Sequence, residues 1–122
     1  MLEHTLTHLQ RQINMHYTNT ANPIDFPKET KMDSQTREVM NILSEEAAEI
    51  VVAVSKCHRF GMDNYKPGKP KTNREHLEEE IGDLLAMIDI LVDMQVINTE
   101  SLEIAKIAKI EKLKQWSTIE NL

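Results

Sequence analysis

The chain has 122 residues, one cysteine and a formal net charge of −6 at pH 7. That length is typical of one ordinary domain, which can bury a core without disulfide or metal staples. Cys57 has no second cysteine to pair with, and neither a signal peptide nor a membrane span is evident, so we expect a cytoplasmic protein. The excess of acidic residues argues against nucleic acid as a partner, and the absence of a span argues against a membrane.

The composition favours helices over sheets. Aromatic residues make up only 4% of the chain and glycine occurs three times, whereas Glu, Lys, Leu, Ile, Ala and Met are abundant. We therefore expect an all-α protein, a single domain over residues 1–122 that is arranged like a four-helix bundle.

The first half of the chain predicts two helices. Apolar residues recur every three or four positions over residues 2–17, which is typical of an amphipathic helix. Residues 19–33 contain two prolines and no period, so a loop is expected there. A second helix is predicted from a cap at Ser34 to about Phe60, with Gly61 ending it.

A third helix follows a proline-rich connection. Residues 65–72 contain two prolines and one glycine and cannot continue the preceding helix. Thr72 and Glu75 have the spacing of a capping box, so the helix is expected to begin there. Its periodic pattern continues to about Val96.

A fourth helix is predicted from a cap at Asn98 or Thr99 to about Trp116. Its large apolar residues recur every three positions, so they drift around the helix by about 60° at each step. One neighbouring helix cannot cover such a surface, and we expect contact with a second subunit. The residues are Ile104, Ile107, Ile110, Leu113 and Trp116.

Acidic residues interrupt the apolar stripes of the second and third helices. Glu46 lies within about 40° of the second helix's apolar residues, and Glu49 about 60° to one side. Glu80 and Asp83 occupy the equivalent positions on the third helix. Glu45 lies at the edge of the apolar stripe of the second helix. Four acids are therefore predicted where a core would otherwise lie.

Ionised carboxylates on a buried face are unstable unless something compensates their charge. Neither stripe contains a lysine, so a bound divalent cation is the preferred explanation. Carboxylate oxygens suit Mg²⁺ or Mn²⁺ rather than zinc. The alternatives are that the acids border a solvent-filled groove, or that they face basic residues of an oligomer partner.

The acid pairs occur in the forms EEAAE, at residues 45–49, and EIGD, at residues 80–83. Together with KCHRFG, NREHLEEEIGDLLAMIDILV and KIAKIEKLKQWS, they resemble the MazG-like, all-α nucleoside triphosphate pyrophosphohydrolases of phages and bacteria. The resemblance covers roughly residues 35–117, and residues 1–34 match poorly. The 30 residues between Glu49 and Glu80 are more than is usual between these motifs.

The resemblance implies hydrolysis of a ribo- or deoxyribonucleoside triphosphate to the monophosphate and pyrophosphate, with Mg²⁺ or Mn²⁺ as cofactor. The biological role would be control of the nucleotide pool or removal of aberrant nucleotides. It also implies a homodimer or homotetramer. By analogy Glu46, Glu49, Glu80 and Asp83 would bind the metal, with Glu45 in support, and either Glu46 or Glu49 would accept a proton from the attacking water.

Basic residues near these motifs are candidates for binding the phosphates. Lys56 and Arg59, at the end of the second helix, resemble a recurrent family position. Lys109 and Lys112 on the fourth helix could also reach a phosphate, although lysines on an exposed helix face are common. The basic loop over residues 66–74 either closes over phosphates or is an ordinary solvated loop.

The base must be bound by other groups. Asn14, or Gln10 in its place, offers an amide that can pair with the edge of a purine. Guanine presents the most groups to such an amide, so guanine nucleotides are the expected substrates. Trp116 either stacks on the base or anchors a core or interface.

The competing hypothesis is a helical oligomerisation or antitoxin-like binding protein that retains the four acids for structure. It differs from the enzyme hypothesis in lacking metal binding and turnover. The nucleotide pyrophosphohydrolase remains the leading hypothesis.

Overall fold

The computed structural model describes residues 32–122 and contains three helices there: α2 (Ser34–Phe60), α3 (Asn73–Asp93) and α4 (Thr99–Trp116). No strand occurs among these residues, so the all-α prediction is confirmed for this part of the chain. The predicted helix over residues 2–17 lies outside the described residues, and the four-helix arrangement stays a prediction. None of the described helices combines the length and the apolar character that a bilayer span needs.

The start of α2 differs from the prediction by one residue. The N-cap is Asp33 and not Ser34, which is already the first helical residue. Asp33 has extended backbone angles, and its carboxylate accepts hydrogen bonds from the N–H of Thr36 at 2.7 Å and from its hydroxyl at 3.0 Å. Both Asp and Ser cap helices well, and the two hydrogen bonds that Asp33 accepts from Thr36 identify it as the cap.

The caps of the other two helices were predicted correctly. Thr72 Oγ1 accepts a hydrogen bond from the N–H of Glu75 at 3.1 Å, and the hydroxyl lies 3.1 Å from the Glu75 carboxylate. Of the two candidates for α4, Asn98 is the cap, because its Oδ1 accepts from the N–H of Ser101 at 3.2 Å. A side-chain oxygen therefore fixes the first turn of each described helix.

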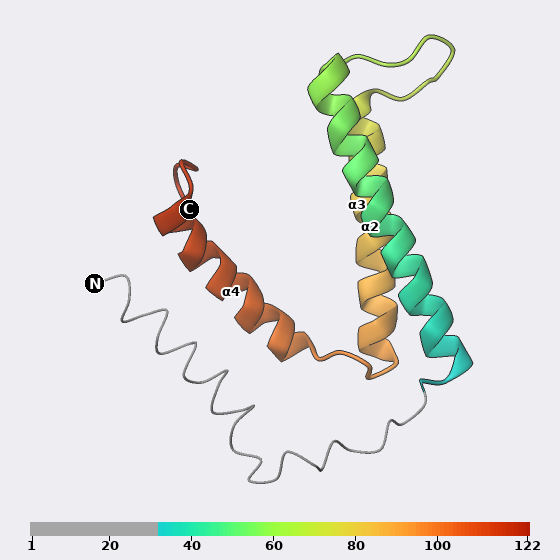
Figure 1. Ribbon diagram of the computed structural model, residues 1–122, viewed down its shortest axis with the longest axis vertical. Coiled ribbons are helices and arrows are strands. Elements are labelled where there is room, and N and C mark those ends of the chain that lie inside the picture. The colour runs from blue at the N-terminus through green and yellow to red at the C-terminus, as the bar shows by residue number, and fades with distance from the viewer. Residues whose placement is uncertain (1–31) are drawn as a thin grey trace, which may run out of the picture. The chain divides into compact units, whose positions relative to one another are not determined.

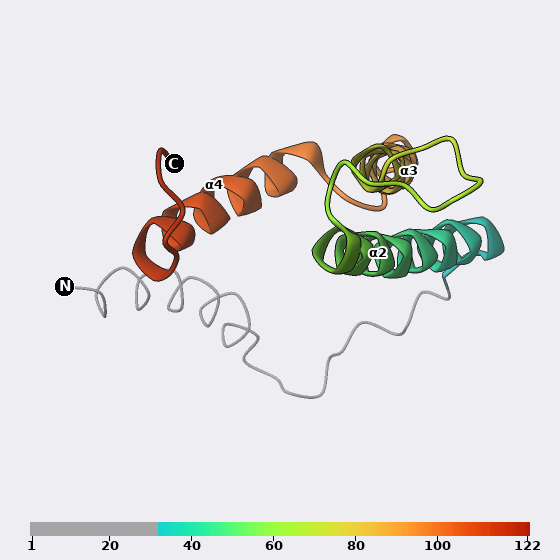
Figure 2. The ribbon, with the colours of Figure 1, turned by 90° about the horizontal axis from the view of Figure 1, so that it is seen from above.

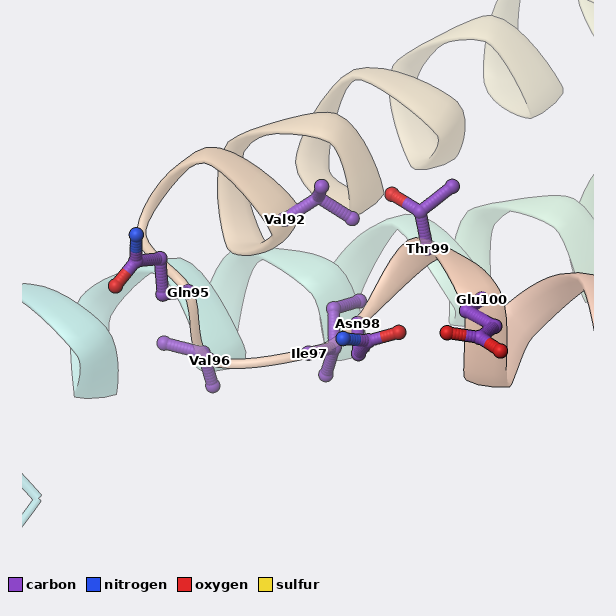
Figure 3. A pocket seen from close by; sticks show the side chains of 7 residues that line it. All are labelled: Val92, Gln95, Val96, Ile97, Asn98, Thr99 and Glu100. Atoms are coloured by element: carbon purple, nitrogen blue, oxygen red, sulfur yellow. The ribbon is translucent and has the colours of Figure 1, made fainter.

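The helix ends depend on residues with positive φ. Gly61, with φ of 88°, follows α2 as predicted. Helix α3 ends at Asp93, before the predicted Val96, because Gln95 has φ of 59° and cannot continue a right-handed helix. The Val96 N–H instead donates to the Leu91 carbonyl at 3.0 Å, which turns the chain into α4 (Figure 3).

Helices α2 and α3 lie side by side as a hairpin, joined by a loop at one end (Figures 1 and 2). Ala53 of α2 and Leu91 of α3 are each only 1% exposed, and Val39 is buried near the start of α2. Near the loop, the thiol of the half-buried Cys57 donates a hydrogen bond to the carbonyl of Asn73 at 3.6 Å. The hairpin core is therefore small.

Large apolar side chains remain exposed on all three helices in residues 32–122. On α4, Ile107 is 64% and Trp116 69% exposed, and no residue of this helix is buried. On the hairpin the exposed set includes Val51, Val52, Ile81 and Leu85. Within residues 32–122, the three helices thus leave part of their apolar faces uncovered. For α4 this agrees with the expectation that one neighbouring helix cannot cover its apolar residues.

We predict that Asp33→Ala lowers the melting temperature at neutral pH by about 4 °C or more, because the first turn of α2 loses its cap. The hydrogen bonds from Thr36 hold the pKa of Asp33 below its ordinary value. The stability that they supply is present above the carboxyl's unfolded pKa and is lost as pH falls through the lower folded value. Thermal denaturation across pH should therefore show the deficit shrinking in acid. Ser34→Ala is the matched control, and an equal loss in that variant would contradict the assignment.

Candidate metal centre

Three of the four predicted metal ligands come together in the hairpin. Glu46 from α2 and Glu80 and Asp83 from α3 each offer a carboxylate oxygen, and these oxygens all lie within 4.8 Å of one another. Glu80 and Asp83 share a face of α3 because they are three residues apart. The packing of α2 against α3 therefore creates the cluster from residues far apart in sequence.

Glu49, the fourth predicted ligand, does not join this group. It is exposed on α2, one helical turn after Glu46, and the exposed Glu45 lies on the same side of the helix, four residues before Glu49. Both side chains still act on the cluster through their charge, because both contribute to the raised pKa of Glu46. The two residues lie beside the three-acid group without completing it.

The cluster carries more negative charge than its surroundings compensate. Glu80 is only 9% exposed, and its closest basic neighbour is His76, whose Nε2 lies 3.6 Å from a carboxylate oxygen of Glu80. Among residues 32–122 no lysine or arginine forms an ion pair with any of the three acids. Partial burial, followed by the charge of Asp83 and the other nearby acids, raises the pKa of Glu46.

The donor set fits a hard divalent cation. All three ligating groups are carboxylates, and oxygen donors select Mg²⁺ or Mn²⁺ over softer metals. A cation between them would also remove the repulsion that raises the pKa of Glu46. The cluster is therefore a candidate metal centre, held by Glu46, Glu80 and Asp83.

The predicted phosphate contacts fall in different places. Lys56 is half-buried on α2 and lines a cavity beside the loop, whereas Arg59 is exposed and stacks over the Phe60 ring at 4.9 Å. Lys109 and Lys112 are exposed on α4. Of these four side chains, only that of Lys56 lines this cavity.

Of the predicted base contacts, only Trp116 belongs to the part of the chain that the structure describes. Asn14 and Gln10 lie outside the described residues. Trp116, at the end of α4, is largely exposed. The structure thus places Trp116 on a surface and leaves its predicted stacking role untested.

The basic loop is partly neutralised by its own ion pairs. Lys71 Nζ lies 2.6 Å from the Glu79 carboxylate, and Arg74 Nε lies 2.9 Å from Asp63. The Glu79 carboxylate, through its hydrogen bond and its charge, raises the pKa of Lys71. Both ion pairs therefore fasten the loop to α3.

His76 is the functional candidate that sequence reasoning missed. None of the sequence motifs described above includes His76 as a ligand or a substrate contact. Its spacing from Glu80 was the available signal, because residues four apart on a helix are neighbours.

A second hollow lies where α3 turns into α4, lined by side chains between Val92 and Glu100 (Figure 3). Its volume is about 620 Å³. It contains none of the three clustered acids and none of the predicted site residues. It therefore does not belong to the candidate metal centre.

Comparison with known proteins points to one family. The sequence model of the MazG nucleotide pyrophosphohydrolase domain matches residues 34–116, well over half of the chain. The matched segment contains all three described helices and the whole acidic cluster. No curated protein and no solved structure matches the chain significantly.

We predict that saturating Mg²⁺ raises the melting temperature by about 5 °C or more, because a cation that binds only the folded site stabilises it. Chelation with EDTA should reverse the increase. In Asp83→Asn and Glu80→Gln the increase should be lost, whereas Glu78→Gln, an exposed position on α3, should keep it. An undiminished increase in Asp83→Asn would contradict the assignment of the cluster.

We also predict that Glu46→Gln stabilises the metal-free protein near neutral pH. Because the pKa of Glu46 is raised in the folded state, the protonated form of this carboxyl favours folding. This contribution to the stability is complete below the ordinary pKa of 4.5 and is lost as pH rises through the higher pKa of the folded state. The uncharged amide avoids that loss. Melting temperatures in EDTA should therefore show a gain that grows from acid to neutral pH. Glu38→Gln, exposed elsewhere on α2, should show no such growth, and a flat difference for Glu46→Gln would refute the prediction.

Proposed function

Because the chain belongs to the MazG nucleotide pyrophosphohydrolase family, we propose that it hydrolyses nucleoside triphosphates to monophosphates and pyrophosphate with Mg²⁺ as cofactor. The observation that carries this proposal is the convergence of Glu46, Glu80 and Asp83 within 4.8 Å. A triphosphate is itself an anion and would be repelled by these carboxylates alone, so metal and substrate must bind together. Mn²⁺ is expected to substitute for Mg²⁺.

The three clustered carboxylates would hold the cation, and the imidazole Nε2 of His76 lies beside Glu80 at 3.6 Å. When bound, the cation supplies positive charge to the phosphate oxygens and polarises the attacking water. Glu46 and Glu80 face the cluster from opposite helices, so the hairpin packing sets the spacing of the ligands. Substitution of one ligand would remove a donor oxygen and so weaken the binding of the cation.

Glu49 is the better candidate for the general base. It lies one turn beyond Glu46 on α2 but outside the three-acid group, so its carboxylate is not already committed to the cation. A carboxylate in that position can accept the proton of the attacking water, as a general base must. Glu45, which precedes Glu46 in the helix, would support the site through its charge.

The site would direct water to the α-phosphorus, which breaks the bond between the α and β phosphates. The water oxygen then ends in the monophosphate, and pyrophosphate leaves. Lys56, Arg59, Lys109 and Lys112 remain candidates for phosphate contacts, and Lys56 is the best placed of them because it lines the cavity beside the loop. We propose control of the nucleotide pool or removal of aberrant nucleotides as the role.

The active form is proposed to be a homodimer or homotetramer. Exposed Val51, Val52 and Leu85 on the hairpin, with Ile104 and Ile107 on α4, offer apolar surface that a second copy would cover. Guanine nucleotides remain the proposed substrates, with Asn14 or Gln10 pairing with the base. The competing proposal, a non-catalytic antitoxin-like protein, requires that metal and turnover both be absent.

We predict that the purified protein with Mg²⁺ converts at least one of the eight common nucleoside triphosphates to its monophosphate and pyrophosphate, with guanine nucleotides preferred. In water labelled with ¹⁸O, mass spectrometry should find the label in the monophosphate. Release of inorganic phosphate, or label in pyrophosphate, would contradict attack at the α-phosphorus. No turnover with Mg²⁺ or Mn²⁺ would favour the non-catalytic protein.

The variants assign roles within this reaction. Glu80→Gln and Asp83→Asn should lose both turnover and the Mg²⁺-dependent rise in melting temperature. Glu49→Gln should lower kcat by about 100-fold or more while keeping that rise, because it removes a base and not a ligand. Glu78→Gln should remain close to the wild type. If Glu49→Gln lost the rise as well, Glu49 would be a ligand.

A further inference from the structure

A cavity lies between the end of α2, the loop over residues 61–72 and the start of α3, at the end of the hairpin where the loop projects (Figure 1). Its volume is about 820 Å³, within the range of roughly 300–1,000 Å³ typical of sites for small molecules. Phe60, Tyr65, Lys66 and Pro67 are among the residues that line it. Its size therefore suits a ligand as large as a nucleoside.

The cavity is connected to the acidic cluster by one residue. His76 lines the cavity, and its Nε2 lies 3.6 Å from the carboxylate of Glu80. Four residues of α-helix separate the two positions, an axial rise of about 6 Å. A molecule bound in the cavity would therefore need a linking group of about the length of one phosphodiester to reach the acidic cluster.

The walls offer stacking surface for a flat ring. Tyr65 is 63% exposed and Phe60 is also exposed, although aromatic rings usually lie in a core. Two prolines and the aliphatic stems of lysines complete an apolar lining. Exposed aromatic faces beside lysines are the features with which proteins hold nucleic acid bases.

The charge at the cavity has the sign that a nucleotide requires. Lys56, Lys66 and Lys69 line it, and within residues 32–122 none of them forms an ion pair. The chain as a whole carries a net charge of −6, so this is a local reversal of sign. Their ammonium groups would offset the charge of phosphates that extend from the cavity towards the acids.

The loop is held in place before any ligand binds. At its base the Asn73 N–H donates to the Asn64 carbonyl and the Arg74 N–H to the Met62 carbonyl, both at 2.8 Å. The side chain of Asn73 also donates to the Gly61 carbonyl at 2.8 Å. With the ion pair between Lys71 and Glu79, these bonds form the walls in advance, which lowers the entropic cost of binding.

We propose that this cavity binds the nucleoside part of the substrate, with the base stacked on Tyr65 and Phe60 and the α-phosphate directed past His76 to the acidic cluster. The inference rests on the proposed function for the identity of the ligand. Stacking tolerates every base, so the cavity contributes affinity and leaves selection among bases to other groups.

The test is calorimetric titration of the full-length protein in Mg²⁺ with two probes: the α,β-imido analogue of dGTP, which cannot be cleaved between these phosphates, and inorganic tripolyphosphate, which has no nucleoside. Tyr65→Ala should weaken binding of the analogue about 10-fold and leave binding of tripolyphosphate unchanged. Tyr65→Phe, which keeps the ring, should restore the binding. In turnover assays Tyr65→Ala should raise KM with kcat within about two-fold.

Three results would overturn the inference: no binding of the analogue to the wild type, equal binding by Tyr65→Ala, or equal weakening of both probes, which would place phosphates in the cavity. Because Tyr65 is exposed on the loop, the fold of the variant is checked by its melting temperature. A wild type that binds the analogue but hydrolyses no triphosphate would refute the proposed function alone. A wild type that hydrolyses triphosphates and is insensitive to Tyr65→Ala would refute the cavity assignment alone.

Discussion

Repulsion among the carboxylates of Glu46, Glu80 and Asp83 is the constraint on which the rest of the structure depends. Like charges within 4.8 Å destabilise the hairpin that carries them, and burial, followed by the charges of Asp83 and Glu80, raises the pKa of Glu46. The hairpin core that must resist it is small, with Ala53 and Leu91 as its most deeply buried residues. Binding of a cation at the proposed site would therefore be coupled to folding, because the cation would neutralise this repulsion.

Much of this fold could be predicted because local signals decide it. The spacing of Thr72 and Glu75 marked the start of α3 correctly, and Gly61 marked the end of α2. The cap of α4, Asn98, is one of the two candidates that the sequence offered. The cap at α2 was misplaced because Asp33 and Ser34 are equally suitable by residue type. The end of α3 was placed too late because Gln95 adopts a positive φ that its residue type does not announce.

The candidate site could be predicted in outline for a different reason. Angular positions on two helices placed Glu46 and Glu80 on the faces that meet, which depends only on helical period. Whether Glu49 joins them depends on the offset between the helices and on its rotamer, which no single-helix projection contains. The roles of the loop lysines could not be predicted for the same reason. Lys71 forms an ion pair because Glu79 of α3 lies opposite it, and nothing in the loop sequence distinguishes Lys71 from Lys66 in this respect.

The bonds at the base of the loop separate two parts of the molecule that can change independently. Asn64 and Asn73 close the loop where the helices meet it, so residues 65–71 lie beyond the closure and outside the packing of α2 on α3. Insertions or substitutions there would reshape the cavity without moving the acids. An ancestral hairpin of this kind could thus diverge in what it recognises while its chemistry is inherited intact, and the loop is where closely related sequences should differ most in length.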